Sequence, residues 1–249
     1  MRIPRVFHDG TASPGEVLEL SPREASHLER VLRRGVGDPV RLVSGSEGLH
    51  DAEILEAADG LSPRVRVRVT RKAEPDAPPL LPWTLGLALV KAEAFELALR
   101  MASELGIHRV APLVTDRSVV RPQEGFRALE KKAERWKRIA EDAAKQCGRS
   151  GPLEVLGAAH LDAFLKNCSC PKRWLAVPSG PVRLLEVVGE GQQLEESAFL
   201  VGPEGGFTPV EVARARAAGF EPIGLPTPVL RTPTAVALIA ALGALAQGR

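Results

Sequence analysis

A strand that runs directly into a glycine-rich turn, and from there into a helix, constrains this chain more than any other segment. The apolar run 198–201 predicts a buried strand, and Gly202-Pro-Glu-Gly-Gly-Phe207 follows it at once. Thr208 is a typical N-cap, Pro209 suits the first helical position, and Glu211 completes a T-x-x-E capping box. Because glycine has no Cβ, such a loop brings backbone N–H groups close to a ligand.

A second motif further along the chain, Leu225-Pro-Thr-Pro-Val-Leu-Arg-Thr-Pro-Thr-Ala235, combines rigidity with apolar character. Its prolines, which hold the backbone extended, are Pro226, Pro228 and Pro233. Its apolar residues in the extended part are Leu225, Val229 and Leu230. An apolar segment stiffened in this way predicts one wall of a pocket for a flat, mostly apolar ligand.

The glycine loop differs from the loops that usually bind phosphate. It lacks the G-x-G-x-x-G spacing of dinucleotide sites, and no Gly-Lys-Ser/Thr follows it as in a P-loop. Its carboxylate, Glu204, would repel a phosphate, so the loop suits a neutral or cationic ligand. Alone, Gly205 and Gly206 would more simply indicate a turn. The proline-stiffened segment that follows favours a binding site.

Together the two motifs resemble the paired C-terminal motifs of the SPOUT class of RNA methyltransferases, and more narrowly those of the RsmE family. The residues that carry the likeness are Val201-Gly-Pro-Glu-Gly-Gly-Phe-Thr-x-x-Glu211 and Leu230-Arg-Thr-x-Thr-Ala235. The resemblance extends over essentially the whole chain. It implies a homodimer that methylates uridine N3 in 16S ribosomal RNA, with S-adenosylmethionine (SAM) bound in a deep trefoil knot.

Three positions of the second motif depart from the family pattern Leu-Gly-x-Arg-Ile-Leu-Arg-Thr-Glu-Thr-Ala. Pro226 replaces the glycine, Pro228 the first arginine and Pro233 the glutamate. Any role that the family gives those side chains therefore does not transfer to this chain. The residues that do match are Arg231, Thr232, Thr234 and Ala235.

A proline-rich segment predicts a division into two domains. Residues 73–82 hold four prolines, which is typical of a semi-rigid linker. Before it, residues 1–72 show short strand patterns at 17–20, 40–43, 52–55 and 65–69. One helix interrupts them, with Ser21, Pro22 and Glu24 at its start and Gly35 at its end. By resemblance this first domain is a PUA-like β-barrel that binds RNA.

Basic residues of the first domain gather at the start of the chain and at the end of its helix. They are Arg2, Arg5, Arg30, Arg33 and Arg34. Arginines at a helix C-terminus also complement the helix dipole, so composition alone leaves that role and phosphate contact equally open. The resemblance favours contact with RNA.

From residue 83 to residue 249 strand patterns alternate with helical ones, which predicts a mostly parallel sheet with helices on both faces. Strands are expected at 84–90, 109–114, 153–155, 173–177, 198–201 and 221–224, and helices at 92–105, 122–149, 161–166, 182–188, after 208 and at 233–247. Ligands of such sheets bind at the carboxyl ends of strands, so Val177 and Pro178 should face the same crevice as the glycine loop. By resemblance this α/β domain is a SPOUT domain with a C-terminal trefoil knot.

Two of the expected helices carry predictions about partners. The helix at 122–149 has a basic face, for which solvation is the usual explanation. The resemblance instead places four polar residues of this helix near the RNA: Lys132, Arg135, Gln146 and Arg149. The helix at 233–247 has no charge, which predicts burial on every side and, at a chain end, contact with a second copy in a homodimer.

The charge, the cysteine count and the lengths of the apolar runs limit which classes of protein this chain can belong to. With 33 basic and 31 acidic residues the net charge is only +2, so any RNA-binding surface must be local. Three cysteines without an apolar leader pattern predict a cytoplasmic protein without disulfides. Cys168-Ser-Cys170 alone is a poor metal site, and no apolar run reaches membrane-spanning length. We therefore expect neither a metal nor a membrane partner.

The expected reaction assigns roles to two charged residues. Uracil N3 must lose its proton before or during methyl transfer, and the negative charge spreads onto the ring oxygens. Arg231 is the candidate for stabilising that charge. Glu204 is a candidate base or ligand anchor, and capping of the helix after Thr208 is an equally simple role for it. The residues expected to bind SAM are Val177, Pro178, Val201, Gly202, Pro203, Glu204, Gly205, Leu225, Pro226, Val229, Leu230, Thr232, Thr234 and Ala235.

Two other functions remain open at the level of sequence. One is that of a SPOUT enzyme that acts on a ribose 2'-hydroxyl or a tRNA base. The other is that of an RNA-binding protein without catalysis, which would not bind SAM. The PUA-like domain favours ribosomal RNA or the small ribosomal subunit as the partner, by resemblance alone.

Overall fold

A computed structural model describes residues 3–44, 48–57, 64–74, 78–118, 127–149, 151–178, 180, 182–188, 194–225 and 229–247. The chain folds into two compact units. The first unit holds Met1–Pro78 and Ala144–Gly151, and the second holds Pro79–Ala143 and Pro152–Arg249. The short segment from Ala144 to Gly151 thus belongs to the first unit, although the sequence suggested that it ends a helix of the second domain.

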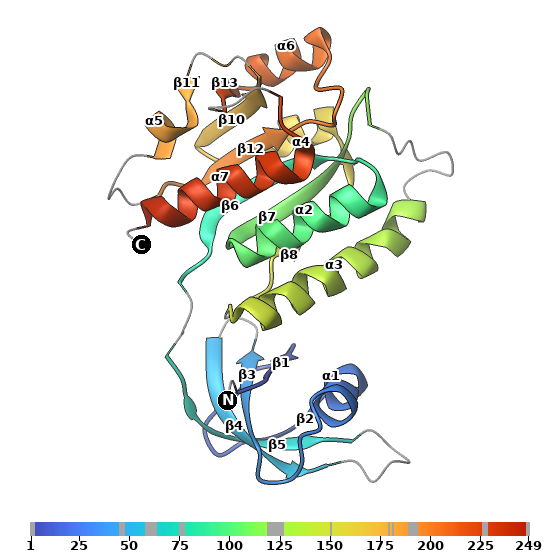
Figure 1. Cartoon of the computed structure of the whole chain (residues 1–249), viewed down its shortest axis with the longest axis vertical. Helices are drawn as coiled ribbons and strands as arrows, with labels where there is room; N and C mark the ends of the chain where they lie inside the picture. The colour runs from blue at the N-terminus through green and yellow to red at the C-terminus, as the bar shows by residue number, and fades with distance from the viewer. Residues whose placement is uncertain are drawn as a thin grey trace. The chain divides into compact units, whose positions relative to one another are not determined.

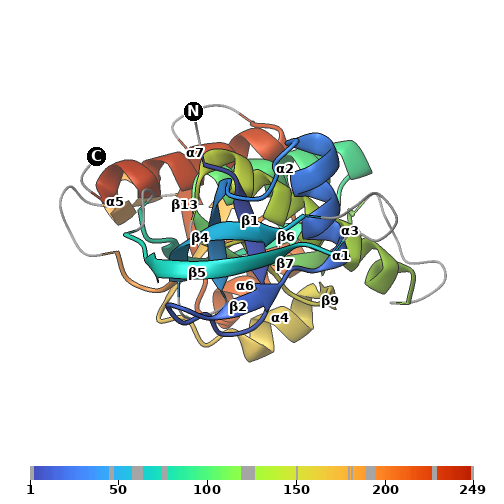
Figure 2. The ribbon, with the colours of Figure 1, turned by 90° about the horizontal axis from the view of Figure 1, so that it is seen from below.

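The first unit is built on a mixed sheet with the strand order β1-β3-β4-β5-β2. Figure 2 labels β1, β2, β4 and β5 of this sheet. Its strands are β1 (Arg5–His8), β2 (Val17–Glu19), β3 (Pro39–Ser44), β4 (Gly48–Glu56) and β5 (Arg66–Lys72). Strand β1 pairs with β3 in parallel and the other neighbours are antiparallel. The two edge strands, β1 and β2, do not pair with each other among the described residues, so the sheet is a half-barrel. Strand β1 was not expected, because it is short and its partner lies far along the sequence.

The helix of the first unit begins as expected but ends early. Helix α1 (Pro22–Ser26) continues into a π-helical turn, η1 (His27–Val31). Ser21 caps it by accepting the N–H of Glu24 at 3.3 Å. The Glu24 carboxylate does not complete a capping box. It is buried, and it accepts the N–H of Phe7 and the ammonium of Lys145.

The second unit is built on a sheet in which every pairing is parallel. Its strand order is β11-β13-β10-β12-β6-β7-β8 (Figure 1). Strand β9 also pairs with β7. Its strands are β6 (Leu81–Ala88), β7 (Ile107–Val114), β8 (Glu154–Val155), β9 (Ala159–His160), β10 (Lys172–Val177), β11 (Val182–Arg183), β12 (Ser197–Val201) and β13 (Glu221–Gly224). The helices after the first unit's α1 are α2 (Ala92–Glu104), α3 (Arg127–Cys147), α4 (Leu161–Asn167), α5 (Leu184–Val188), α6 (Pro209–Ala217) and α7 (Thr232–Ala246). The predicted alternation of strands and helices is confirmed.

Some boundaries differ from those expected. Strand β6 begins at Leu81, inside the segment expected to be a linker, of which residues 75–77 lie outside the described residues. The segment 182–188 forms a short strand before a short helix, because a short apolar run does not distinguish the two by periodicity. Residues 122–126, expected to begin the long helix, also lie outside the described residues.

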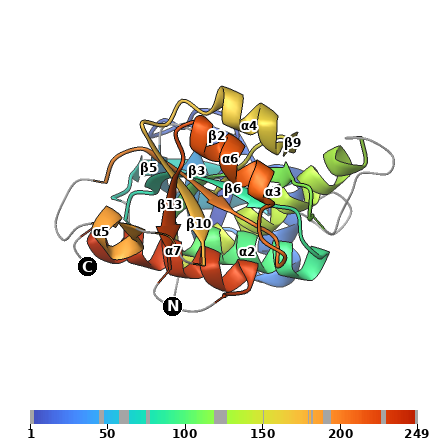
Figure 3. The same cartoon turned by 90° about the horizontal axis from the view of Figure 1, so that it is seen from above.

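Helices cover both faces of the parallel sheet (Figure 3). Helices α2 and α7 lie side by side on one face, and α4 and α6 lie on the other. On the first face Trp83 and Phe199 are in ring contact with centroids 4.7 Å apart. A Cβ on Gly243 of α7 would lie 2.4 Å from the Trp83 ring, so only glycine lets this helix approach β6 so closely.

Helix α7 is not buried on every side within one chain. Val236, Ile239 and Ala240 are buried against the sheet and α2, whereas Leu245 is 60% exposed. Nothing in the described part of this chain covers the outer face of the helix end. The expected burial there depends on a second copy of the chain and stays a prediction.

Candidate functional site

The glycine loop leaves the carboxyl end of the central strand β12, all of whose residues are buried. A turn follows, in which the N–H of Gly206 donates to the carbonyl of Pro203 at 2.8 Å. Gly206 has φ +67°, a conformation that side chains with a Cβ rarely adopt. At Gly202 a Cβ would lie 3.1 Å from the Phe207 ring. These two glycines give the loop its tight shape.

The helix after the loop is capped as the sequence predicts. The hydroxyl of Thr208 accepts the N–H of Glu211 at 3.2 Å, and the Glu211 carboxylate accepts the N–H of Thr208 at 2.7 Å. Both partners of the predicted capping box are therefore present, and α6 begins at Pro209. Glu204 is exposed and has no part in this cap, so the capping role considered for it is taken by Glu211.

The second motif is tied directly to the first. The buried hydroxyl of Thr232, at the start of α7, donates to the carbonyl of Gly202 at 3.0 Å. Leu225, which follows β13, and Val229 and Leu230, which precede α7, lie at the same place. The carboxyl ends of β10, β12 and β13 thus converge on one site, as ligand sites of parallel sheets do.

A cavity of about 340 Å³ lies between the two motifs. Among the residues expected to bind SAM, the cavity is lined by Val177, Pro178, Val201, Gly202, Pro203, Glu204, Gly205, Leu225, Val229, Leu230, Thr232 and Ala235. Thr234 is exposed on α7 and does not line it, while Pro226 and Pro228 lie outside the described residues. The lining residues that the sequence analysis missed are Ala176, Gly206, Phe207 and Val212. Phe207 and Val212 were within reach of prediction, because they flank the glycine loop and the first turn of the capped helix.

The cavity is apolar in its walls and acidic at its rim. Glu204 is the one charged residue among the described residues that line it, and its side chain is exposed. Its volume is that of a small-molecule site. Close backbone approach at Gly202 and Gly206, apolar walls and one carboxylate suit a flat ligand that carries a positive charge.

Arg231 lies between two cavity residues, Leu230 and Thr232, but is itself exposed. It is the residue immediately before the first turn of α7. Its side chain is in contact with solvent beside the cavity.

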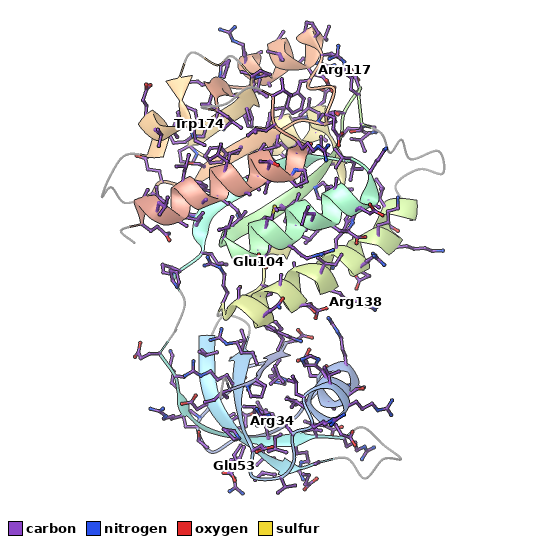
Figure 4. The ribbon with its side chains drawn as sticks, viewed as in Figure 1. Arg34, Glu53, Glu104, Arg117, Arg138 and Trp174 are labelled. Carbon is purple, nitrogen blue, oxygen red and sulfur yellow. The ribbon has the colours of Figure 1, made fainter. Side chains whose placement is uncertain are left out.

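The arginines of the first unit that were expected to contact RNA fall into two groups. Arg30 and Arg33 are exposed, and Arg34 has its guanidinium 3.9 Å from Asp38 (Figure 4). Arg5 is 5% exposed and donates to the carbonyl of Arg149 at 3.0 Å. Arg149 is 7% exposed and donates to the carbonyl of Pro78 at 3.2 Å. Burial therefore gives Arg5 and Arg149 a packing role in place of the RNA contact expected, and Arg2 lies outside the described residues.

The three remaining polar residues expected near RNA lie on α3. Lys132 and Gln146 are exposed. Arg135 makes two hydrogen bonds to Glu96 of α2, at 2.6 and 2.9 Å. That pairing lowers the pKa of Glu96, chiefly through the side-chain hydrogen bond from Arg135. Arg135 thus joins α3 to α2, and with Lys132 it borders a second cavity of about 250 Å³ beside Phe95 and Trp136.

Neither a metal site nor a membrane span accompanies the cavity in the part of the chain that the structure describes. Within those residues, no group of three or more His, Cys, Asp and Glu side chains is placed to hold a metal ion. None of the helices there is both long and apolar enough to cross a membrane.

Comparison with known proteins defines the class. Residues 77–245 match a family model described as an RNA methyltransferase domain, which covers well over half of the chain. The chain belongs to this family of RNA methyltransferases, and both motifs of the site fall inside the matched region.

The relatives narrow the class further. Over 233 residues the chain is 31% identical to the ribosomal RNA small subunit methyltransferase E of a Synechocystis species, covering 90% of this chain and 72% of that protein. It is 27% identical to the protein of the same name from Rickettsia conorii, covering 100% of this chain and 96% of that one. A methyltransferase structure from Legionella pneumophila with SAM bound is 29% identical and superposes with a TM-score of 0.85 over 98% of both chains.

Proposed function

We propose that this protein transfers the methyl group of SAM to N3 of a uridine in 16S ribosomal RNA, in the cytoplasm. The observation that carries the proposal is the cavity that the two motifs form at the carboxyl ends of β10, β12 and β13. The relatives named as small-subunit rRNA methyltransferases support the substrate, and the SAM-bound Legionella structure supports the cofactor.

The residues present fit SAM. The apolar lining, which includes Val177, Leu225 and Leu230, suits an adenine ring. SAM supplies an electrophilic methyl group on a positively charged sulfonium. The carboxylate of Glu204 at the rim is the charge that would attract such a cation.

Two exposed side chains at the cavity are assigned roles in the reaction. Uridine N3 must lose a proton, and negative charge then spreads onto the uracil oxygens. Arg231 stands between cavity residues with its side chain open to an entering base, so we assign it to that charge. Glu204 lines the cavity and is exposed, and we assign it either to anchoring the cofactor or to accepting the proton.

We further propose that the chain closes a trefoil knot around this site. Support comes from a close crossing of two backbone segments. A Cβ on Gly180, in the segment between β10 and β11, would lie 2.1 Å from the carbonyl carbon of Ile223 in β13. Strand β13 itself lies between β10 and β11 in the sheet. Gly180, which follows β10 and precedes β11, thus lies close to β13, the strand that separates β10 from β11 in the sheet. Such a crossing is expected where the chain passes through a loop of its own backbone.

The proposed partners are ribosomal RNA and a second copy of the chain. The half-barrel of the first unit, with Arg30 and Arg33 exposed, is proposed as a PUA-like RNA-binding module. For a homodimer the support is the uncharged helix α7, whose Leu245 is 60% exposed, together with Leu185 and Val229, which are 57% and 73% exposed.

The test is a methylation assay with a product that distinguishes the alternatives. The full chain is incubated with tritiated SAM and small ribosomal subunits that lack the modification, and the RNA is digested to nucleosides. We expect label in 3-methyluridine. Label in a 2'-O-methylated nucleoside would replace this proposal with that of a ribose methyltransferase, and no label together with no SAM binding would make the protein an RNA-binding module.

A matched pair of glycine variants links the product to the cavity. Gly206→Val places a branched side chain at φ +67° in the cavity wall and should abolish labelling. Gly157→Val changes an exposed glycine with open space around its Cβ position and should label RNA like the natural chain.

A further inference from the structure

A turn from another part of the sheet is attached to the glycine loop. Strand β7 ends at Val114, and residues 115–118 form a turn in which the N–H of Thr115 donates to the hydroxyl of Ser118 at 3.0 Å. Arg117 extends from this turn, and its Nη1 donates to the carbonyl of Gly205 at 2.6 Å (Figure 4). We propose that Arg117 is a positioning residue that holds the glycine loop in its ligand-binding shape, an inference that rests on the function proposed above.

The same turn also holds the end of the loop. The N–H of Asp116 donates to the buried carboxylate of Glu211 at 2.8 Å. The hydroxyl of Thr208 donates to the carboxylate of Asp116 at 3.2 Å. Because these hydrogen bonds attach the turn to the N-terminal cap of α6, the backbone of Arg117 is held in place.

The bond from Arg117 holds one peptide group of the cavity wall. The carbonyl of Gly205 and the N–H of Gly206 belong to the same trans peptide unit. Arg117 holds that carbonyl on one side, and the carbonyl of Pro203 accepts the N–H on the other at 2.8 Å. A peptide between two glycines rotates readily, since neither residue has a Cβ to limit its dihedrals. Without the arginine, this peptide is free to flip. The Gly206 N–H and the Gly205 carbonyl would then exchange directions in the cavity wall.

Packing of the arginine stem adds to this restraint. A Cβ at Gly205 would lie 3.4 Å from the Cδ of Arg117, so the stem covers one face of Gly205. The side chain is otherwise exposed. Its removal should leave the core intact, and the effect should be confined to the loop.

The experiment compares Arg117→Ala and Arg117→Lys with a control, Arg214→Ala. Arg214 is also exposed and also makes a 2.6 Å hydrogen bond, to Asp162, but it does not line the cavity. We expect Arg117→Ala to weaken SAM binding in calorimetry by about tenfold, as for loss of one hydrogen bond to a charged group. Turnover at saturating SAM should stay within about twofold, because the loop still reaches its bound shape. Lysine should restore part of the affinity, and the Arg214→Ala protein should bind as the natural chain does.

Hydrogen exchange of the Gly206 amide in the ligand-free protein provides a readout that does not depend on catalysis. We expect faster exchange in Arg117→Ala and natural exchange in Arg214→Ala. Unchanged exchange with unchanged SAM affinity would overturn the inference. So would lost turnover at saturating SAM with unchanged affinity, because Arg117 would then act on the RNA. If the natural chain fails to bind SAM, the proposed function falls, whereas the exchange measurement still decides whether Arg117 holds the loop.

Discussion

The glycine loop of the second unit and the basic segment of the first, residues 30–36, are held in opposite ways. The loop is fixed by side chains from other elements, namely Arg117, Thr232 and the Thr208–Glu211 cap. The basic segment is closed by bonds to residues near it in the sequence. The N–H of Leu32 donates to the carbonyl of His27, and that of Gly35 to the carboxylate of Asp38.

Exposure follows the same division. Val31 and Val36 in the basic segment are 66% and 67% exposed, whereas Val201 at the start of the loop is buried. A small ligand needs a preformed cavity, while a large polymer needs side chains that reach outward. The comparison therefore indicates that substitutions at the loop should act on catalysis and folding, and those at the basic segment chiefly on RNA affinity.

The largest effect is expected at Arg231. If this guanidinium stabilises charge in the transition state, Arg231→Ala should lower turnover by roughly 10²–10³-fold. Affinity for SAM in calorimetry should stay close to that of the natural chain, because Arg231 does not line the cavity.

The control for Arg231 is Arg231→Lys, which keeps the charge and should retain more activity than alanine. Light scattering decides between catalysis and assembly. Monomers in Arg231→Ala alone would show that the arginine holds a second copy of the chain. Normal turnover would remove it from the site and turn attention to Glu204.

A second comparison uses two glycines, one from each unit. Gly180→Ala places a Cβ 2.1 Å from the backbone of Ile223, where neither segment has a flexible atom to move aside. We expect a loss of about 3 kcal/mol in the free energy of unfolding.

Gly35→Ala in the basic segment is the matched control. Its Cβ would meet nothing within 4 Å and its φ is not positive, so stability should change by less than about 1 kcal/mol. Urea unfolding of both variants measures the difference. Equal stability of the two would mean that the crossing of residues 180 and 223 relaxes easily, which would also weaken the case for a knot.

The two regions also differ in how far the sequence predicted them. The strand, the capping box and most of the cavity lining followed from local patterns, because strand, turn and cap are encoded by neighbouring residues. Arg117 could not be found in this way, since it meets Gly205 only through the order of β7 and β12 in the sheet. The burial of Arg5 and Arg149 was missed for the same reason. An arginine that packs against distant carbonyls has the same local sequence as one that faces RNA.

The smallest effect, and the one that separates charge from backbone shape, is expected at Arg33. This residue has φ +51° at the end of the π-helical turn, where helices usually place glycine. An arginine there costs about 1 kcal/mol relative to glycine.

Arg33→Gly should therefore change stability and RNA binding in opposite directions. The free energy of unfolding should rise by up to about 1 kcal/mol. Affinity for ribosomal RNA should fall a few-fold, and the slope of log affinity against log salt should decrease by about one. Arg34→Ala is the internal comparison, because its guanidinium already faces Asp38 and should contribute less. If Arg33→Gly is more stable and binds RNA with the natural salt slope, this arginine is no phosphate contact, and the RNA-binding surface must be sought away from the basic segment.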